Sequence, residues 1–143
     1  MVKKYKANRK GPIPYMIALL VLLPIVIYVT NTEDFSEQPY MLLPLIAPLA
    51  LLLWVFLSTW YQIANGKLKY KSGFLWGEIN ISDIRQLIVG ETMWAGLKPA
   101  LASKGIIVKY NRYDEIYIAP ENNLELIEDL RSLNPTIEVI IKK

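Results

Sequence analysis

The sequence predicts an α+β protein in which two long apolar helices precede a small β-rich domain with one amphipathic helix. Three features support this class: the uncharged stretches 13–30 and 40–57, an Asn65-Gly66 pair between two alternating segments, and an amphipathic segment at 120–135. Charged residues make up 20% of the chain and lie mainly at the extreme N-terminus and beyond residue 66. This asymmetry indicates a membrane-anchored protein with one folded domain.

The two uncharged stretches read IPYMIALLVLLPIVIYVT and YMLLPLIAPLALLLWVFL. Each is long enough for a transmembrane helix candidate, which needs about 18 or more apolar residues. Both contain proline, and membrane helices tolerate proline because neighbouring groups satisfy the freed carbonyls. A soluble pair of buried helices is the alternative, but the rest of the chain is too short to cover two helices that are apolar on every face.

The charges around these stretches predict their orientation. Glu33, Asp34 and Glu37 lie between them, whereas lysine and arginine lie before the first and after the second. The positive-inside rule then places both termini in the cytoplasm, with residues 1–12 as a basic cytoplasmic tail. A cleaved signal peptide followed by an anchor is disfavoured, because no small-residue cleavage site follows Thr30. We therefore expect a transmembrane helical hairpin over residues 13–57.

Asn65-Gly66 predicts a tight β-hairpin at the start of the folded domain, since both turn positions of type I′ require positive φ. Pairing outward from this turn sets Ile63 opposite Leu68 and separates an apolar face from a lysine-bearing face. The competing interpretation makes Gly66 the cap of a longer helix that ends at Ala64. That helix would leave the downstream alternation without a partner strand, so the hairpin is favoured.

The remaining segments predict a strand at 74–81, a turn, a strand at 85–91, an irregular connection at 92–104 and a second hairpin around 112–114. A helix at 120–135 and a short strand to the C-terminus complete the domain. The apolar stripe of the helix is expected to consist of Leu124, Ile127, Leu130 and Leu133, with Leu126 at its margin.

The segments YQIANGKLKYKSG, EINISDI, PALASKGIIVKY and IYIAPENNLELIEDLRSLNPTIEV occur in an order that resembles the YyaB-like PH domain family of bacteria. The resemblance covers about Tyr61 to Val139 and implies a PH-like domain over 58–143, with a curved antiparallel sheet capped by one amphipathic helix. That family commonly has one or two membrane spans before the domain. Ala119-Pro120 stands where the family usually has Ser-Pro, so a capping hydroxyl is missing.

The composition excludes several classes of chemistry. The chain has neither cysteine nor histidine, so thiolate nucleophiles, histidine bases and the usual zinc sites are excluded. We therefore assign no catalytic, cofactor-binding or metal-binding residue and expect a non-enzymatic protein. Nucleic acid is not an expected partner, because the net charge is only +3 and a nucleic-acid binder carries a basic face on its folded domain. Five basic residues instead lie in the predicted tail: Lys3, Lys4, Lys6, Arg9 and Lys10.

Two surfaces are candidates for binding. Lys67, Lys69 and Lys71 alternate along one predicted strand close to the bilayer, where each lysine near an anionic leaflet contributes about 1 kcal/mol. The alternative is that these lysines only mark topology and solvate a sheet face. A protein partner would instead meet the irregular connection, whose candidate residues are Trp94, Lys98 and Ser103.

The expected function is a membrane-anchored PH-like binding module on the cytoplasmic face of a bacterial membrane. Its expected partners are the lipid bilayer and a membrane or cytoplasmic protein. The resemblance also implies a second function, bacteriocin self-immunity, because PH-like membrane proteins of this type include an immunity protein. An unrecognised membrane enzyme is a third class, and no acid–base or metal arrangement in the sequence favours it.

Overall fold

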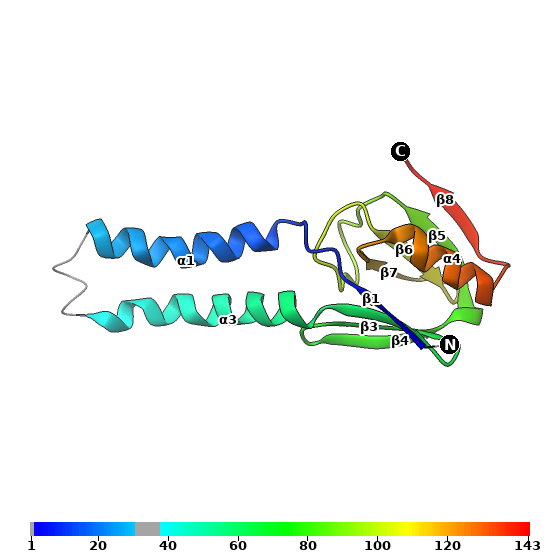
Figure 1. Ribbon diagram of the computed structural model, residues 1–143, viewed down its shortest axis with the longest axis horizontal. Coiled ribbons are helices and arrows are strands. Elements are labelled where there is room, and N and C mark those ends of the chain that lie inside the picture. Colours follow the sequence, from blue (N-terminus) through cyan, green and yellow to red (C-terminus); the bar gives the residue numbers. More distant parts are fainter. Residues whose placement is uncertain (1, 31–37) are drawn as a thin grey trace.

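The computed structural model describes residues 2–30 and 38–143, in which a pair of helices projects from a β-rich domain (Figure 1). Helix α1 spans Ile13–Thr30, and helix α3 spans Leu43–Ser58 after the short 3-10 helix η1 at Pro39–Leu42. The two long helices pack side by side, and no residue of either is buried. Ile13–Thr30 and Tyr40–Ser58 are each long and apolar enough to cross a membrane. The acidic residues predicted to lie between them fall outside the described residues.

The domain consists of two four-stranded sheets and one helix. The first sheet has the order β1-β2-β3-β4, with strands Val2–Lys6, Trp60–Ala64, Lys67–Ser72 and Leu75–Asn80. The 3-10 helix η2 at Ile81–Asp83 leads to the second sheet. That sheet has the order β7-β6-β5-β8, with β5 at Ile84–Val89, β6 at Ile106–Tyr110, β7 at Asp114–Ile118 and β8 at Glu138–Ile141. Helix α4 spans Asn123–Leu133. This arrangement of helices, sheets and a C-terminal helix confirms the predicted α+β class.

The predicted hairpin at Asn65-Gly66 is confirmed. Asn65 and Gly66 have φ angles of 52° and 72°, the positive values that a type I′ turn requires. Strands β2 and β3 pair in the expected register, with Ile63 opposite Leu68. Helix α3 ends at Ser58, so Gly66 does not cap a longer helix.

The N-terminal segment is a strand of the domain, where the sequence predicted a basic tail over residues 1–12. Strand β1 pairs antiparallel with β2, so Tyr5 lies opposite Tyr61 at the edge of the first sheet. Past the strand, the Asn8 amide donates to the Ala119 carbonyl at 2.8 Å, and the Glu121 amide donates to the Lys6 carbonyl at 2.8 Å. These bonds join the end of β1 to the segment that follows β7, and an isolated bridge pairs Ala7 with Pro120.

Strand β8 runs parallel to β5, whereas the sequence predicted an antiparallel sheet. The direction follows from the chain path. Strands β5, β6 and β7 alternate in direction, so β7 runs the same way as β5. Helix α4 then returns the chain to the starting end, and β8 enters the sheet in the direction of β7.

The core lies between the two sheets and α4, and it corrects the predicted stripe of the helix. Leu126, Ile127 and Leu130 are buried, whereas Leu124 is 62% exposed and Leu133 is 45% exposed. The helix also has a side-chain cap, since Asn122 Oδ1 accepts a hydrogen bond from the Glu125 amide at 3.3 Å. The absence of a serine hydroxyl before Pro120 therefore does not leave the helix uncapped, because the helix begins at Asn123 and Asn122 is its N-cap.

Candidate functional site

The two helices join the domain through tight connections at one end of the first sheet. Only Thr59 separates α3 from β2, and its hydroxyl donates to the Val55 carbonyl at 2.6 Å and bonds the Ser72 hydroxyl at 2.9 Å. The Gly73 amide donates to the Ser58 hydroxyl at 2.9 Å. Helix α3 is therefore fixed to the turn between β3 and β4 as well as to β2.

Lysine and tryptophan alternate across the strand ends next to the helices. Lys6 of β1 lies opposite Trp60 of β2, which lies opposite Lys71 of β3, which lies opposite Trp76 of β4. Trp76 is 79% exposed. Tryptophan is enriched at membrane–water interfaces, and lysine is attracted to anionic headgroups. We call these four residues the junction row.

The predicted lipid-facing lysines share one face of β3, but that strand runs away from the helices. Lys71 belongs to the junction row, whereas Lys67 lies beside the Asn65-Gly66 turn at the far end of the hairpin. Glu78 forms salt bridges with Lys67 and with Lys69, the latter at 3.8 Å. The hydrogen bond from Lys67 lowers the pKa of the Glu78 carboxyl below its ordinary value. Of the three lysines, Lys71 is therefore the one at the junction.

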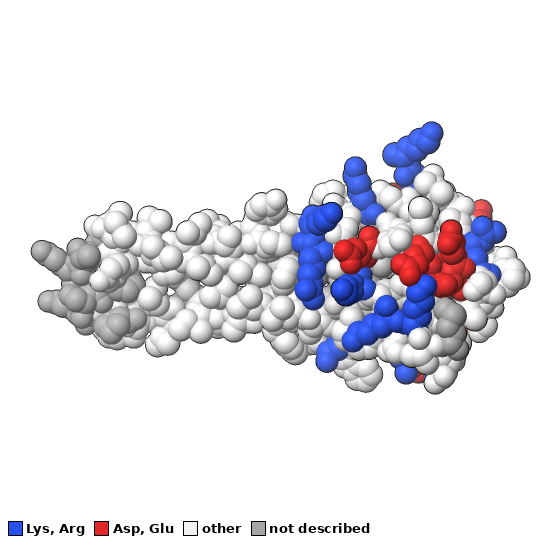
Figure 2. All heavy atoms as spheres, viewed as in Figure 1, with Lys and Arg blue, Asp and Glu red and all other residues white. Residues whose placement is uncertain are grey.

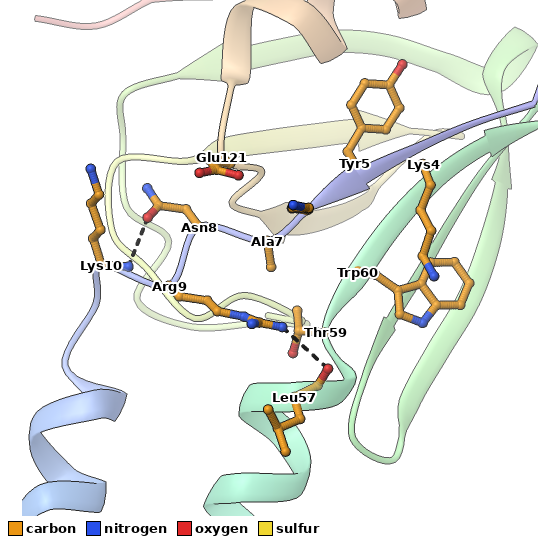
Figure 3. Close-up of a pocket in the computed structure, with 11 residues that line it drawn as sticks. Lys4, Tyr5, Ala7, Asn8, Arg9, Lys10, Leu57, Thr59, Trp60 and Glu121 are labelled. Atoms are coloured by element: carbon orange, nitrogen blue, oxygen red, sulfur yellow. Dashed lines mark hydrogen bonds between the residues drawn. The ribbon is translucent and has the colours of Figure 1, made fainter.

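A pocket of about 610 Å³ lies at the junction, between the connection from β1 to α1 and the start of β2 (Figure 3). The Lys4 ammonium lies 4.9 Å from the centroid of the Trp60 ring, and the Arg9 guanidinium lies 5.0 Å from that of Phe56. Arg9 also donates to the Leu57 carbonyl at 3.5 Å, near the negative end of the α3 dipole. This junction pocket is lined by Lys4, Tyr5, Lys6, Ala7, Asn8, Arg9, Lys10, Leu57, Thr59, Trp60 and Glu121.

The junction pocket is strongly basic. Four of its lining residues are cationic and one, Glu121, is acidic. Among residues 2–30 and 38–143, none of the four cations takes part in a salt bridge. On the face drawn in Figure 2, lysine and arginine gather where the helices meet the domain, and the helical pair itself carries no charge. The arrangement favours an anion at the level where the helices begin.

A second charged cluster holds β1 against α4. The Lys3 ammonium contacts Asp129 at 2.6 Å and Glu125 at 2.8 Å, and the Tyr5 hydroxyl donates to Asp129 at 2.5 Å. The hydrogen bond from Lys3, followed by that from Tyr5, lowers the pKa of the Asp129 carboxyl. Burial, followed by the bond to Asp129, raises the pKa of the Tyr5 hydroxyl. The charged and polar groups of this cluster are paired with one another, so we interpret the cluster as structural: it holds β1 against α4.

The predicted partner-facing residues all lie on the connection between β5 and β6. The Trp94 side chain is 94% exposed, and Ser103 is also exposed. The Lys98 ammonium lies 5.1 Å from the centroid of the Tyr117 ring. Tyr61 fixes this connection to the core, because its buried hydroxyl donates to the Pro99 carbonyl at 2.7 Å and accepts from the Ala119 amide at 3.1 Å.

Sequence reasoning missed the junction pocket because seven of its lining residues, from Lys4 to Lys10, were assigned to a basic tail. The signal was the segment VKKYKA, in which Lys4 and Lys6 alternate with Tyr5 and Ala7. Tyr5 and Ala7 are buried and the two lysines are exposed, as the two faces of a strand require.

The Bacterial PH domain family matches residues 59–134, from the residue before β2 to the residue that follows α4. Strand β1, the two apolar helices and β8 lie outside the matched region. Neither a curated protein nor a solved structure matches the chain. Because the matched region covers more than half of the chain, the protein belongs to the Bacterial PH domain family.

Proposed function

We propose that the protein is a membrane-anchored, non-enzymatic binding module on the cytoplasmic face of a bacterial membrane. The observation that carries the proposal is the way in which the two apolar helices leave the domain. They depart from neighbouring strands of one sheet, β1 and β2, through short connections. Such an attachment would hold the PH domain at the bilayer surface, and PH domains are generally non-catalytic binding modules.

The exposed apolar surface of the two helices supports a membrane location. The two helices pack side by side, and Ile13, Val55 and Phe56 at their domain ends pack against the core. Many of their other apolar side chains are exposed. Removing apolar surface from water is favourable by about 25 cal/mol of free energy per Å². A lipid bilayer would provide apolar surroundings for both helices at once.

The pairing of β1 with β2 supports a hairpin topology. Strand β1 precedes α1 and β2 follows α3, so both ends of the helical pair lie on the same side of any membrane that it crosses. The junction at this side carries Lys6, Arg9, Lys10 and Lys71, which favours the cytoplasmic side. Within the family, the order of the quoted segments favours the YyaB-like subfamily.

The proposal predicts which parts of the domain lie close to lipid headgroups. Phe74 is 65% exposed and lies in the turn next to α3, whereas Tyr113 is 83% exposed at the distal hairpin between β6 and β7. The full chain, reconstituted in vesicles, would carry a fluorophore on Phe74→Cys or on Tyr113→Cys. The chain has no other cysteine, so each label is unique. We expect lipids with a headgroup quencher to quench the label at residue 74 strongly and that at residue 113 weakly.

The full chain is needed because a fragment of residues 59–143 would lack β1. A water-soluble quencher is the control and should act on both labels when added from the domain side. Equal headgroup quenching at the two positions would contradict the expected orientation, in which residue 74 lies near the headgroups and residue 113 lies far from them. Absence of headgroup quenching at residue 74 would contradict the membrane anchor itself.

A further inference from the structure

We infer that the junction pocket binds the phosphate-bearing headgroup of an anionic phospholipid whose acyl chains lie along α1 and α3. This inference rests on the proposed membrane location and adds a specific ligand class to it. It assigns a role to a basic cavity most of whose lining residues lie outside the region matched by the family. Strand β1 and the connection to α1 precede residue 59.

The first argument is the unbalanced charge of the junction pocket. Lys4 and Arg9 each lie against an aromatic ring, and the ammonium groups of Lys6 and Lys10 belong to exposed side chains. None of the four has a carboxylate partner in the described parts of the chain. Lysine and arginine form short, strong hydrogen bonds to phosphate oxygens, and arginine can bind them in a bidentate manner. A phosphate group would therefore supply the anionic partner that these cations lack within the described residues.

The second argument is the position of the cavity along the helices. Leu57 lies in the last turn of α3, is 65% exposed and lines the junction pocket together with the half-buried Trp60. Arg9 reaches the same turn through its bond to the Leu57 carbonyl (Figure 3). The pocket thus combines cationic side chains with the apolar side chains of Leu57 and Trp60 at the level where α3 ends. This matches a phospholipid, whose phosphate lies at the boundary and whose chains continue into the hydrocarbon.

The third argument concerns the part of the headgroup beyond the phosphate. The junction pocket, at about 610 Å³, is larger than one phosphate group needs and falls within the range of small-molecule sites. Glu121 lines it with an exposed carboxylate, which can accept hydrogen bonds from hydroxyl groups. These features favour a headgroup with hydroxyls, such as the glycerol of phosphatidylglycerol.

The test compares two variants with equal changes in charge. Lys6→Gln with Lys10→Gln removes two cations from the junction pocket, and neither side chain makes a hydrogen bond or salt bridge within the described residues. Lys67→Gln with Lys69→Gln removes two cations from the distal end of the first sheet. Binding of short-chain phosphatidylglycerol to the full chain in neutral detergent would be measured by native mass spectrometry, with short-chain phosphatidylcholine as the zwitterionic control.

We expect the unaltered chain to retain phosphatidylglycerol in preference to phosphatidylcholine. The pocket variant should lose about tenfold or more in affinity, and the distal variant should keep most of it. Equal losses in both variants would show nonspecific charge attraction and would overturn the inference. Equal retention of the two lipids would also overturn it. So would competition by glycerol phosphate at the concentration of the lipid, because such competition would show a site for a free anion. Failure here leaves the quenching of residue 74 unchanged, so it is distinguishable from failure of the membrane anchor.

Discussion

Replacing Tyr5 with alanine should detach the N-terminal strand and destabilise the domain by about 3 kcal/mol, the lower end for removal of a buried aromatic side chain. Tyr5 is 5% exposed and packs in the core shared by both sheets. Its hydroxyl also donates to Asp129 on α4. The free energy of unfolding would be measured by denaturant titration of the full chain in detergent, followed by circular dichroism in the near ultraviolet.

Hydrogen exchange would locate this effect, and Tyr5→Phe is the matched control. The control keeps the ring and leaves Asp129 bonded to Lys3, so we expect a loss of only about 1 kcal/mol. In Tyr5→Ala, the amides of β1 should exchange much faster than those of β6. Unchanged protection of β1 would show that residues 2–6 are held independently of this side chain, which would contradict the role assigned to Tyr5.

Leu126→Ala should cost about 2–5 kcal/mol of unfolding free energy, the range for a leucine in a core that cannot collapse around the cavity. Leu126 has no exposed surface and packs with Leu130 against both sheets. The same denaturant titration would measure the loss. An unchanged slope of the transition would show that the denatured state is unaffected.

Leu124→Ala is the control because the sequence placed Leu124 in the apolar stripe and the structure exposes it. Its side chain is 62% exposed, so we expect a change within about 0.5 kcal/mol. A large loss at Leu124 with little loss at Leu126 would restore the predicted stripe and contradict the observed orientation of α4.

The features that could be predicted from the sequence are those with strong local signals. The uncharged stretches define the two helices, and Asn65-Gly66 determines both the turn and its register because only a turn with positive φ joins strands so tightly. The order of strands before one amphipathic helix led to the PH-like fold, and the family match supports it.

The features that were missed depend on contacts between distant segments. Strand β1 is short and rich in lysine, and its partner β2 lies beyond both helices, so only the folded structure reveals the pairing. The predicted apolar face of α4 was wrong at Leu124 and Leu133, which are exposed, and Leu126 is fully buried where the sequence placed it at the margin. The proximity of Lys71 to the helices, and the pairing of Lys67 with Glu78, also depend on the direction of β3 relative to α3.

The proposed topology places β1 and the rest of the domain together on the cytoplasmic side of a membrane crossed by α1 and α3. Single cysteines tested with an impermeant thiol reagent address it directly, because the chain has no native cysteine. Val2 is 67% exposed and Ser132 is exposed on α4, and residue 36 lies between the two apolar stretches. We expect Ser36→Cys to react in intact cells, and Val2→Cys and Ser132→Cys to react only after the membrane is permeabilised. Reaction of Val2→Cys or Ser132→Cys in intact cells would contradict the proposed topology.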